Sequence, residues 1–363
     1  MWYEKFGFKD DPYVIRSPMV VPLERIKWNR DDLSDKPSFL KFVQRVLDGR
    51  RVGMKVYGGE GSGKTWLIRY IEKVLKEKSK RKALVLYIYG GIRRLEPTFS
   101  NFYEEFVRRI EPHLPKILGA IHKKAGYKRT NWDKYLGDKD LATALSVIRE
   151  GREDDVRKAW LWLLGRRMSA AELRDIKIVS PLLGDYKKYE VLRTLIQHSL
   201  LVFSSFTLVV DELENAPPAF ARALGDTLRD LIDSFYDKFS LVCSYTTEIA
   251  DELIDLGYGI FLYKRLEHEV KMNALESDAT VSFLRIHHEC YRKPGYKVQD
   301  QLFPFEASGV KRLVDLTDPK QCYPRTVLTN CGVLAEEAAT ATKDTKVTAA
   351  FVNDNKEFLS YLA

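Results

Sequence analysis

Short apolar runs recur along this chain, and their length and composition predict buried β-strands. Each run is rich in β-branched and aromatic residues and ends at glycine or at a polar or charged residue. Longer stretches with apolar residues at helical spacing lie between several of the runs. This alternation predicts an α/β fold. The predicted strands lie at residues 54–58, 82–91, 207–214, 239–248 and 263–275.

The same pattern divides the chain into regions. Residues 1–35 are rich in aromatic residues and proline, and they predict an extended N-terminal arm that packs its aromatic rings on the body of the protein. Residues 36–275 hold all the predicted strands and form the main domain. Within it, about residues 95–200 alternate apolar and charged positions at helical period and predict a long helical insertion. Residues 276–363 contain no predicted strand and should form a small helical domain.

The stretch after the first predicted strand has the pattern G-x-x-x-x-G-K-[ST], which is typical of phosphate-binding loops. Glycines let such a loop point consecutive backbone N–H groups at an anion, and the helix that follows adds the positive end of its dipole. Lys64 would reach the β- and γ-phosphates, and the hydroxyl of Thr65 would ligate Mg²⁺. We therefore predict a site for a nucleoside triphosphate, formed by Gly58, Gly59, Glu60, Gly61, Ser62, Gly63, Lys64, Thr65 and Trp66.

Two later predicted strands end in polar residues that complement this loop. The third strand ends at Asp211 and Glu212. Asp211 would hold Mg²⁺ through water, and Glu212 would polarise the water that attacks the γ-phosphate. The fourth strand offers Ser244 or Thr246 as a sensor beside the γ-phosphate. The alternative for these last two side chains is that they are simply polar residues at the end of a strand.

Charge gives a first indication of the partner. The 363 residues carry 59 basic and 51 acidic side chains, and the resulting net charge of +8 suits contact with nucleic acid. Residues 123–134 combine basic residues with Tyr127 and Trp132. This composition is typical of a nucleic-acid surface, where basic groups contact phosphates and rings stack on bases. It describes an exposed loop with two anchoring rings equally well.

Three further features of the sequence indicate the cellular compartment of the protein. No apolar run reaches the roughly 18–20 residues that a membrane span needs. The charged and aromatic N-terminus lacks the apolar core of a signal peptide. The four cysteines show no C-x-x-C spacing and are interpreted as free thiols. We therefore expect a cytoplasmic protein with no membrane partner.

The order of these motifs resembles the AAA+ ATPases, in particular the clade of origin-recognition-type initiators and transposon target-selector ATPases. Three segments carry the resemblance, at residues 58–65, 207–215 and 322–338. The resemblance implies a P-loop fold with a parallel sheet, a C-terminal helical lid, and ATP and Mg²⁺ as cofactors. It also implies that Arg325, after Pro324, senses the γ-phosphate from the lid. Arg265 matches the arginine finger that acts on the nucleotide of a neighbouring subunit, which implies a homo-oligomer.

A narrower resemblance concerns the helical insertion. Residues 158–179 look like the ATP-binding proteins of BREX-type phage-defence systems, which also carry a long helical insertion before an Asp-Glu-x-Glu motif. Two features depart from the initiators. Thr65 and Asp211 are 146 positions apart, longer than a compact initiator core requires. The chain also leaves no room after the lid for a winged-helix DNA reader, so recognition of an origin sequence is not expected.

These observations support two functions from different classes. The first is a Mg²⁺-dependent AAA+ ATPase that acts on DNA as an oligomer, with protein partners in a defence, replication or transposition complex. The alternative is a signalling switch or scaffold that binds ATP and recruits a protein partner without touching DNA. A metabolic kinase is disfavoured, because a lid arginine and a trans-acting finger have no purpose there. Salt-dependent DNA binding would separate the first two.

Overall fold

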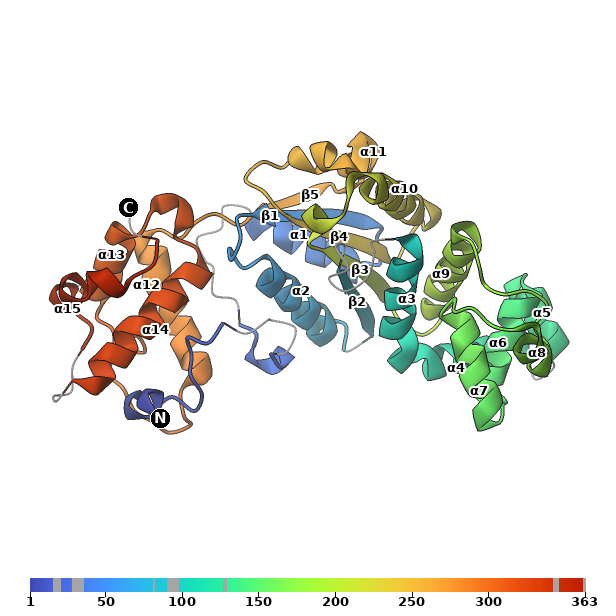
Figure 1. Ribbon diagram of the computed structural model, residues 1–363, viewed down its shortest axis with the longest axis horizontal. Helices are drawn as coiled ribbons and strands as arrows, with labels where there is room; N and C mark the ends of the chain where they lie inside the picture. Colours follow the sequence, from blue (N-terminus) through green and yellow to red (C-terminus); the bar gives the residue numbers. More distant parts are fainter. Residues whose placement is uncertain are drawn as a thin grey trace.

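The computed structural model describes residues 1–15, 21–27, 36–80, 82–89, 98–126, 129–341 and 346–361. Among these residues, a five-stranded sheet lies at the centre of the molecule (Figure 1). Its order is β2-β3-β4-β1-β5, and every neighbouring pair of strands is parallel. The predicted α/β fold with a parallel sheet is therefore confirmed. The strands are β1 (Val52–Gly58), β2 (Ala83–Tyr89), β3 (Ser205–Asp211), β4 (Phe239–Thr246) and β5 (His268–Lys271).

The last strand is shorter than the sequence pattern predicts. Residues 263–265 do not extend β5 but end a helix, α11 (Gly259–Arg265). The apolar side chains of Leu262 and Leu266 lie one helical turn apart, and both are buried. The prediction of a strand from residue 263 was wrong because a short apolar run fits either period.

Helices cover both faces of the sheet, as buried side chains on both faces of a parallel sheet require. On one face, α1 and α2 pack their apolar residues against β1, β2 and β5. On the other face, α3, α10 and α11 contribute to a second and larger core. The bounds of these helices are α1 (Lys36–Leu47), α2 (Lys64–Lys78), α3 (Phe99–Ile110) and α10 (Pro218–Ser234).

The segment between β2 and β3 forms the predicted helical region and extends to one side of the sheet (Figure 1). Its buried residues belong to the same continuous core as those of the sheet face behind α3 and α10. The helical region therefore continues the hydrophobic core that lies on this face of the sheet. After α3 it consists of α4 (Leu114–Ala125), α5 (Arg129–Leu136), α6 (Lys139–Glu150), α7 (Glu153–Leu163), α8 (Ala170–Asp175) and α9 (Asp185–Ser199).

The basic and aromatic stretch at residues 123–134 agrees with an anchoring role for Trp132, although this residue lies on a helix and not in a loop. Tyr127 lies outside the described residues. Trp132 belongs to α5 and is only 3% exposed, and its indole N–H donates to the carbonyl of Gly126 at 3.2 Å. A ring buried in this way cannot stack on a base. The amphipathic helix explains the pattern better than a loop, because Trp132 faces the core of the insertion.

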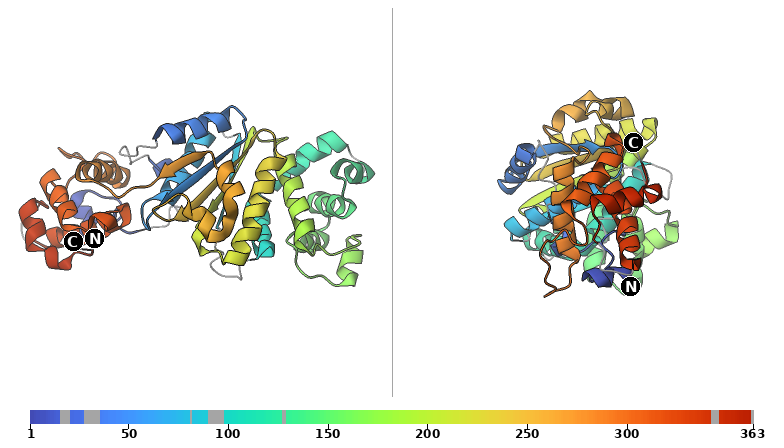
Figure 2. Two further views of the ribbon diagram at one scale, coloured as in Figure 1. Left: turned by 90° about the horizontal axis from the view of Figure 1, so that it is seen from above. Right: turned by 90° about the vertical axis from the view of Figure 1, so that its left-hand side faces the viewer.

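The C-terminal bundle forms the opposite end of the molecule, and Figure 2 shows both chain termini there. The N-terminal segment takes part in its core: Phe6, Phe8 and Tyr13 are buried among the apolar residues of the bundle. The hydroxyl of Tyr13 also makes a 2.8 Å hydrogen bond with Nε2 of His288. The bundle consists of α12 (Ser277–Tyr291), α13 (Ala307–Leu316), α14 (Pro324–Thr340) and α15 (Ala349–Asp354).

The N-terminal segment has a second attachment, on helix α2. The indole of Trp66 donates to the carbonyl of Lys27 at 2.9 Å, and Nζ of Lys73 donates to the carbonyl of Ile26 at 2.8 Å. Ile26 itself is fully buried. The N-terminal segment therefore contacts both the bundle and the main domain. Within the described part of the chain, no helix combines the length and the apolar character that a membrane crossing requires.

Candidate nucleotide-binding site

The P-loop lies where the sequence places it, between the end of β1 and the start of α2. Gly58, Gly61 and Gly63 have φ values of 147°, 75° and 100°, which L side chains rarely adopt. Helix α2 begins at Lys64 directly after Gly63. The glycines therefore fold the loop tightly, and the first turn of α2 presents free N–H groups to an anion.

The Lys64 side chain folds back across this loop. Its Nζ donates to the carbonyl of Gly58 at 2.8 Å and to that of Gly59 at 3.0 Å. Burial lowers the pKa of Lys64, and nearby carboxylates oppose this effect, with Glu214 ahead of Asp211. A buried ammonium held by two carbonyl groups lacks a full counter-charge, and phosphate oxygens would supply one.

Asp211 lies beside the loop, as predicted, and is fully buried. Its Oδ2 accepts a 2.9 Å hydrogen bond from Oγ1 of Thr65 and a second hydrogen bond from the hydroxyl of Tyr87. Its Oδ1 accepts from the backbone N–H of Glu212 at 3.0 Å. Burial raises the pKa of Asp211 to about 7. A cation beside this carboxylate would therefore be stabilising.

Two further carboxylates follow Asp211 on a short turn. Glu212 has a left-handed backbone with φ of 58°, and its Oε2 accepts from Nδ2 of Asn215 at 3.2 Å. One carboxylate oxygen of Glu214, Oε2, is buried and makes no hydrogen bond to any described residue. Sequence reasoning missed Glu214. Glu214 is the second Glu of the Asp-Glu-x-Glu motif, but its proximity to Lys64 depends on the turn that follows β3, which the motif does not indicate.

The two sensor candidates lie on β4 at different depths. Thr246 pairs with Gly58, so it stands at the mouth of the P-loop, and it is half-buried. Ser244 is fully buried, and its hydroxyl has no hydrogen-bond partner among the described residues. It follows Cys243, which pairs with Val210, the residue before Asp211. Its register therefore places Ser244 beside the acidic end of β3, and the sensor role of either residue stays a prediction.

Residues from the C-terminal bundle close over the loop in the same chain. Arg325 donates from Nη1 to Oε1 of Glu60 at 2.5 Å, and its backbone N–H donates to the carbonyl of Gly61 at 3.3 Å. The ring of Tyr323 lies so close to Gly59 that a Cβ there would be 2.4 Å from the ring. Arg325 thus lies beside the P-loop of its own chain, and its role as a sensor of the γ-phosphate stays a prediction. The Arg325–Glu60 pair is exposed and holds Arg325 only weakly.

Arg265 lies at the other end of the sheet. Its carbonyl packs against Gly53 at the start of β1, roughly 16 Å of strand away from Gly58 at the mouth of the P-loop. Its guanidinium makes two 2.9 Å hydrogen bonds with the carboxylate of Asp233. The structure therefore does not bring Arg265 to the P-loop of its own chain. Only a neighbouring subunit could use it as a finger.

The residues of this site fit ATP and Mg²⁺. Backbone N–H groups, Lys64 and Arg325 provide donors and positive charge for phosphate oxygens. Thr65 and Asp211 place two oxygens of the kind that Mg²⁺ prefers 2.9 Å apart, where Thr65 would ligate the ion and Asp211 would hold it through water. The buried carboxylate of Asp211 has a raised pKa and so favours a nearby cation. Trp66 contacts the N-terminal segment and contributes to the site through its place on α2.

Two solved structures share this fold at low sequence identity. The ORC2 protein of Aeropyrum pernix, solved as ADPNP–ADP complexes, is 11% identical, with a TM-score of 0.55 over 97% of this chain and 73% of that one. Cdc6p from Pyrobaculum aerophilum is 14% identical, with a TM-score of 0.52 over 93% of this chain and 72% of that one. This chain has the ORC2/Cdc6p fold. The resemblance to origin-recognition-type AAA+ ATPases is thereby confirmed at the level of the fold.

Comparison of the sequence with protein families and curated proteins gave no relative. No family model and no curated protein matches this chain. The resemblance of residues 158–179 to BREX-type proteins is not tested and stays a prediction.

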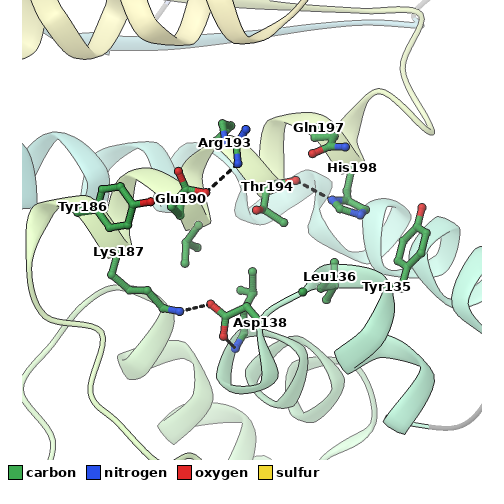
Figure 3. A pocket seen from close by; sticks show the side chains of 13 residues that line it. Tyr135, Leu136, Asp138, Tyr186, Lys187, Glu190, Arg193, Thr194, Gln197 and His198 are labelled. Atoms are coloured by element: carbon green, nitrogen blue, oxygen red, sulfur yellow. Dashed lines mark hydrogen bonds and ion pairs between the residues drawn. The ribbon is translucent and has the colours of Figure 1, made fainter.

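A hollow lies in the insertion of this ORC2/Cdc6p-like chain, between α9 and the junction of α5 and α6. It encloses about 450 Å³ and shares no residue with the phosphate motifs. Figure 3 shows its charged groups paired with one another, Lys187 with Asp138 and Arg193 with Glu190. Because these four charges cancel, the hollow offers no excess of positive charge to a nucleic acid.

Proposed function

We propose that this protein is a Mg²⁺-dependent ATPase that uses ATP binding and hydrolysis to control its oligomerisation and its engagement of DNA. The observation that carries the proposal is a convergence on the P-loop. Lys64, the Thr65–Asp211 pair and Arg325 come from three parts of the chain and meet there. The ORC2/Cdc6p fold supports the proposal, because the ORC2 structure was solved with ADPNP and ADP.

Each residue has a defined part in this reaction. The P-loop N–H groups and Lys64 hold the phosphates, and Thr65 with Asp211 holds the metal. Mg²⁺, when bound, neutralises phosphate charge. Glu212 orients the attacking water and accepts its proton. Arg325 exchanges Glu60 for the γ-phosphate, since a doubly charged phosphate attracts an arginine more strongly than an exposed carboxylate does.

Arg265 supplies the last positive charge from a neighbouring subunit. We expect Arg265→Ala to bind ATP normally but to lose about 10³-fold in turnover, as removal of an arginine finger does. Mixtures of Arg265→Ala with Lys64→Ala should recover part of the activity, because each variant supplies what the other lacks. Steady-state ATPase assays of the separate and mixed variants measure this.

The matched control for Arg265→Ala is Arg51→Ala. Arg51 also faces Asp233, with Nη1 3.6 Å from its Oδ1. Arg51→Ala therefore removes a comparable ion pair with Asp233 and leaves Arg265, the proposed finger, in place. Arg51→Ala should keep wild-type turnover. Normal hydrolysis by Arg265→Ala would remove the finger from the proposal.

The DNA part of the proposal rests on the net charge of +8 and on the exposed lysines of the insertion. Lys123 and Lys124 are exposed at the end of α4. We expect duplex or single-stranded DNA to stimulate the ATPase and its affinity to fall steeply with salt, because phosphate contacts release counterions. Lys123→Glu with Lys124→Glu should weaken binding about 10-fold or more and make the salt dependence shallower.

The control for that double variant is Lys293→Glu with Lys297→Glu, which changes the net charge equally on the C-terminal bundle. Equal weakening by both double variants would show that overall charge, and not the insertion, attracts DNA. If the protein binds no DNA and DNA leaves its ATPase unchanged, the alternative function is favoured: a nucleotide switch that recruits a protein partner. The paired charges around the hollow in Figure 3 are compatible with that alternative.

A sizing measurement completes the test. ATP with Mg²⁺ should increase the oligomeric mass of the protein, and ADP should increase it less. Light scattering behind a sizing column measures the mass directly. A mass that is the same with ATP, with ADP and without nucleotide would contradict control of oligomerisation by ATP.

A further inference from the structure

Tyr87 brings the second strand of the sheet into contact with the metal-binding end of the site. It lies on β2, far from both phosphate motifs in the sequence, and is 6% exposed. Its register partner on β3 is Val209, two residues before Asp211. Residues two apart on a strand face the same side, so Tyr87, Val209 and Asp211 all face helix α2. The Tyr87 hydroxyl donates to Oδ2 of Asp211 from this position.

The same carboxylate oxygen accepts a hydrogen bond from Thr65. The hydroxyls of Thr65 and Tyr87 would have different roles when Mg²⁺ and nucleotide are bound. A hydroxyl that ligates a metal through a lone pair can still donate its O–H to Asp211, but its orientation is then set by the ion and by the helix that carries it. Tyr87 lies behind the carboxylate on a central sheet and keeps its place. A ligand held by such an outer partner has a fixed orientation, which favours metal binding.

We propose that Tyr87 is a positioning residue of the Mg²⁺–nucleotide site, and that its hydroxyl holds the Asp211 carboxylate in the orientation that receives the metal. This inference rests on the proposed function. Tyr87 does not touch nucleotide or water in this scheme. Its contribution is to the coupling between metal and nucleotide, so removal of the hydroxyl should leave metal-free nucleotide binding intact.

The test is Tyr87→Phe, with a fluorescent ATP analogue as the probe. Dissociation constants are measured in EDTA and across a Mg²⁺ titration. In EDTA the variant should match the wild type within about twofold. The Mg²⁺ concentration at half-maximal enhancement of binding should rise about 10-fold, which is the usual effect of losing an outer partner of a metal ligand. This readout does not depend on hydrolysis.

Tyr57→Phe is the matched control. Tyr57 lies on β1, is also 6% exposed, and donates its hydroxyl to Oε1 of Glu269 at 2.6 Å. Its side chain belongs to the core on the opposite face of the sheet from Tyr87. Tyr57→Phe therefore removes a hydroxyl–carboxylate hydrogen bond of the same kind at a position away from Asp211. Thermal unfolding without nucleotide, measured on both variants, shows whether each folds as the wild type does.

Three results would overturn the inference. An unchanged Mg²⁺ titration in Tyr87→Phe would show that Asp211 is held without it. An equal shift in Tyr57→Phe would show that any lost tyrosine hydroxyl in the sheet has the same effect. A wild-type protein that binds no nucleotide would overturn the proposed function, and the role of Tyr87 with it. In the first two cases the proposed function stands.

Discussion

Lys64→Ala is expected to abolish ATP binding and to leave the protein folded. The ammonium of Lys64 lies across the P-loop on two carbonyl groups, and it would pair there with the β- and γ-phosphates. Loss of a buried charge partner costs about 2–5 kcal/mol, so the affinity for ATP should fall by about 30-fold or more. Isothermal titration with ATP and Mg²⁺ measures the loss.

The stability of this variant separates a binding defect from misfolding. Burial lowers the pKa of Lys64, which means that the folded protein disfavours its charge. Its removal should therefore not lower the unfolding temperature measured without nucleotide. Lys78→Ala, at the exposed end of the same helix, is the matched control and should bind ATP like the wild type. Wild-type affinity in Lys64→Ala would contradict the placement of the nucleotide.

Glu212→Gln is expected to bind ATP as the wild type does but to hydrolyse it about 10²–10⁴-fold more slowly, the usual effect of removing a general base. Glutamine has nearly the same shape as glutamate, and its side-chain oxygen can still accept the hydrogen bond from Asn215. The change thus removes the base with little disturbance of the turn. Single-turnover hydrolysis with excess protein measures the chemical step separately from ADP release.

Glu214→Gln is the informative comparison for that prediction. Glu214 lies two positions further along the turn, and its carboxylate is the first of those that oppose the lowering of the pKa of Lys64 by burial. Its replacement should alter ATP affinity, because it changes the charge that Lys64 meets, while leaving the chemical step nearly intact. If Glu214→Gln stops hydrolysis and Glu212→Gln does not, the role of general base belongs to Glu214.

The local parts of the site could be predicted from the sequence alone. The P-loop needs glycines, a lysine and a hydroxyl at fixed spacing, and all of these lie within Gly58–Thr65. The acidic end of β3 is equally local, since an apolar run ending in Asp211 and Glu212 is continuous in sequence. Their meeting followed from one rule: the carboxyl ends of parallel strands share an edge of the sheet.

The remaining contacts depend on the fold, which sequence patterns do not encode. Tyr87 and Asp211 are 124 positions apart and meet because β2 and β3 pair. Tyr323 reaches Gly59 because the C-terminal bundle folds back over the main domain. The sequence left open whether Trp132 stacks on a base or anchors its segment, and the packing of the insertion buries it. In each case the partner lies on another element, so spacing along the chain gives no signal.

The two attachments of the N-terminal segment set how the C-terminal bundle can move. The chain joins the bundle to β5 once, and the segment ties it to α2 a second time through Ile26 and Lys27. A body tethered at two points can turn about the line between them but cannot slide freely. If the bundle turned in this way, Arg325 would move along an arc that meets the P-loop at one end. Nucleotide exchange would then require a swing of the bundle along this arc, and the length of the N-terminal segment would limit how far the site opens.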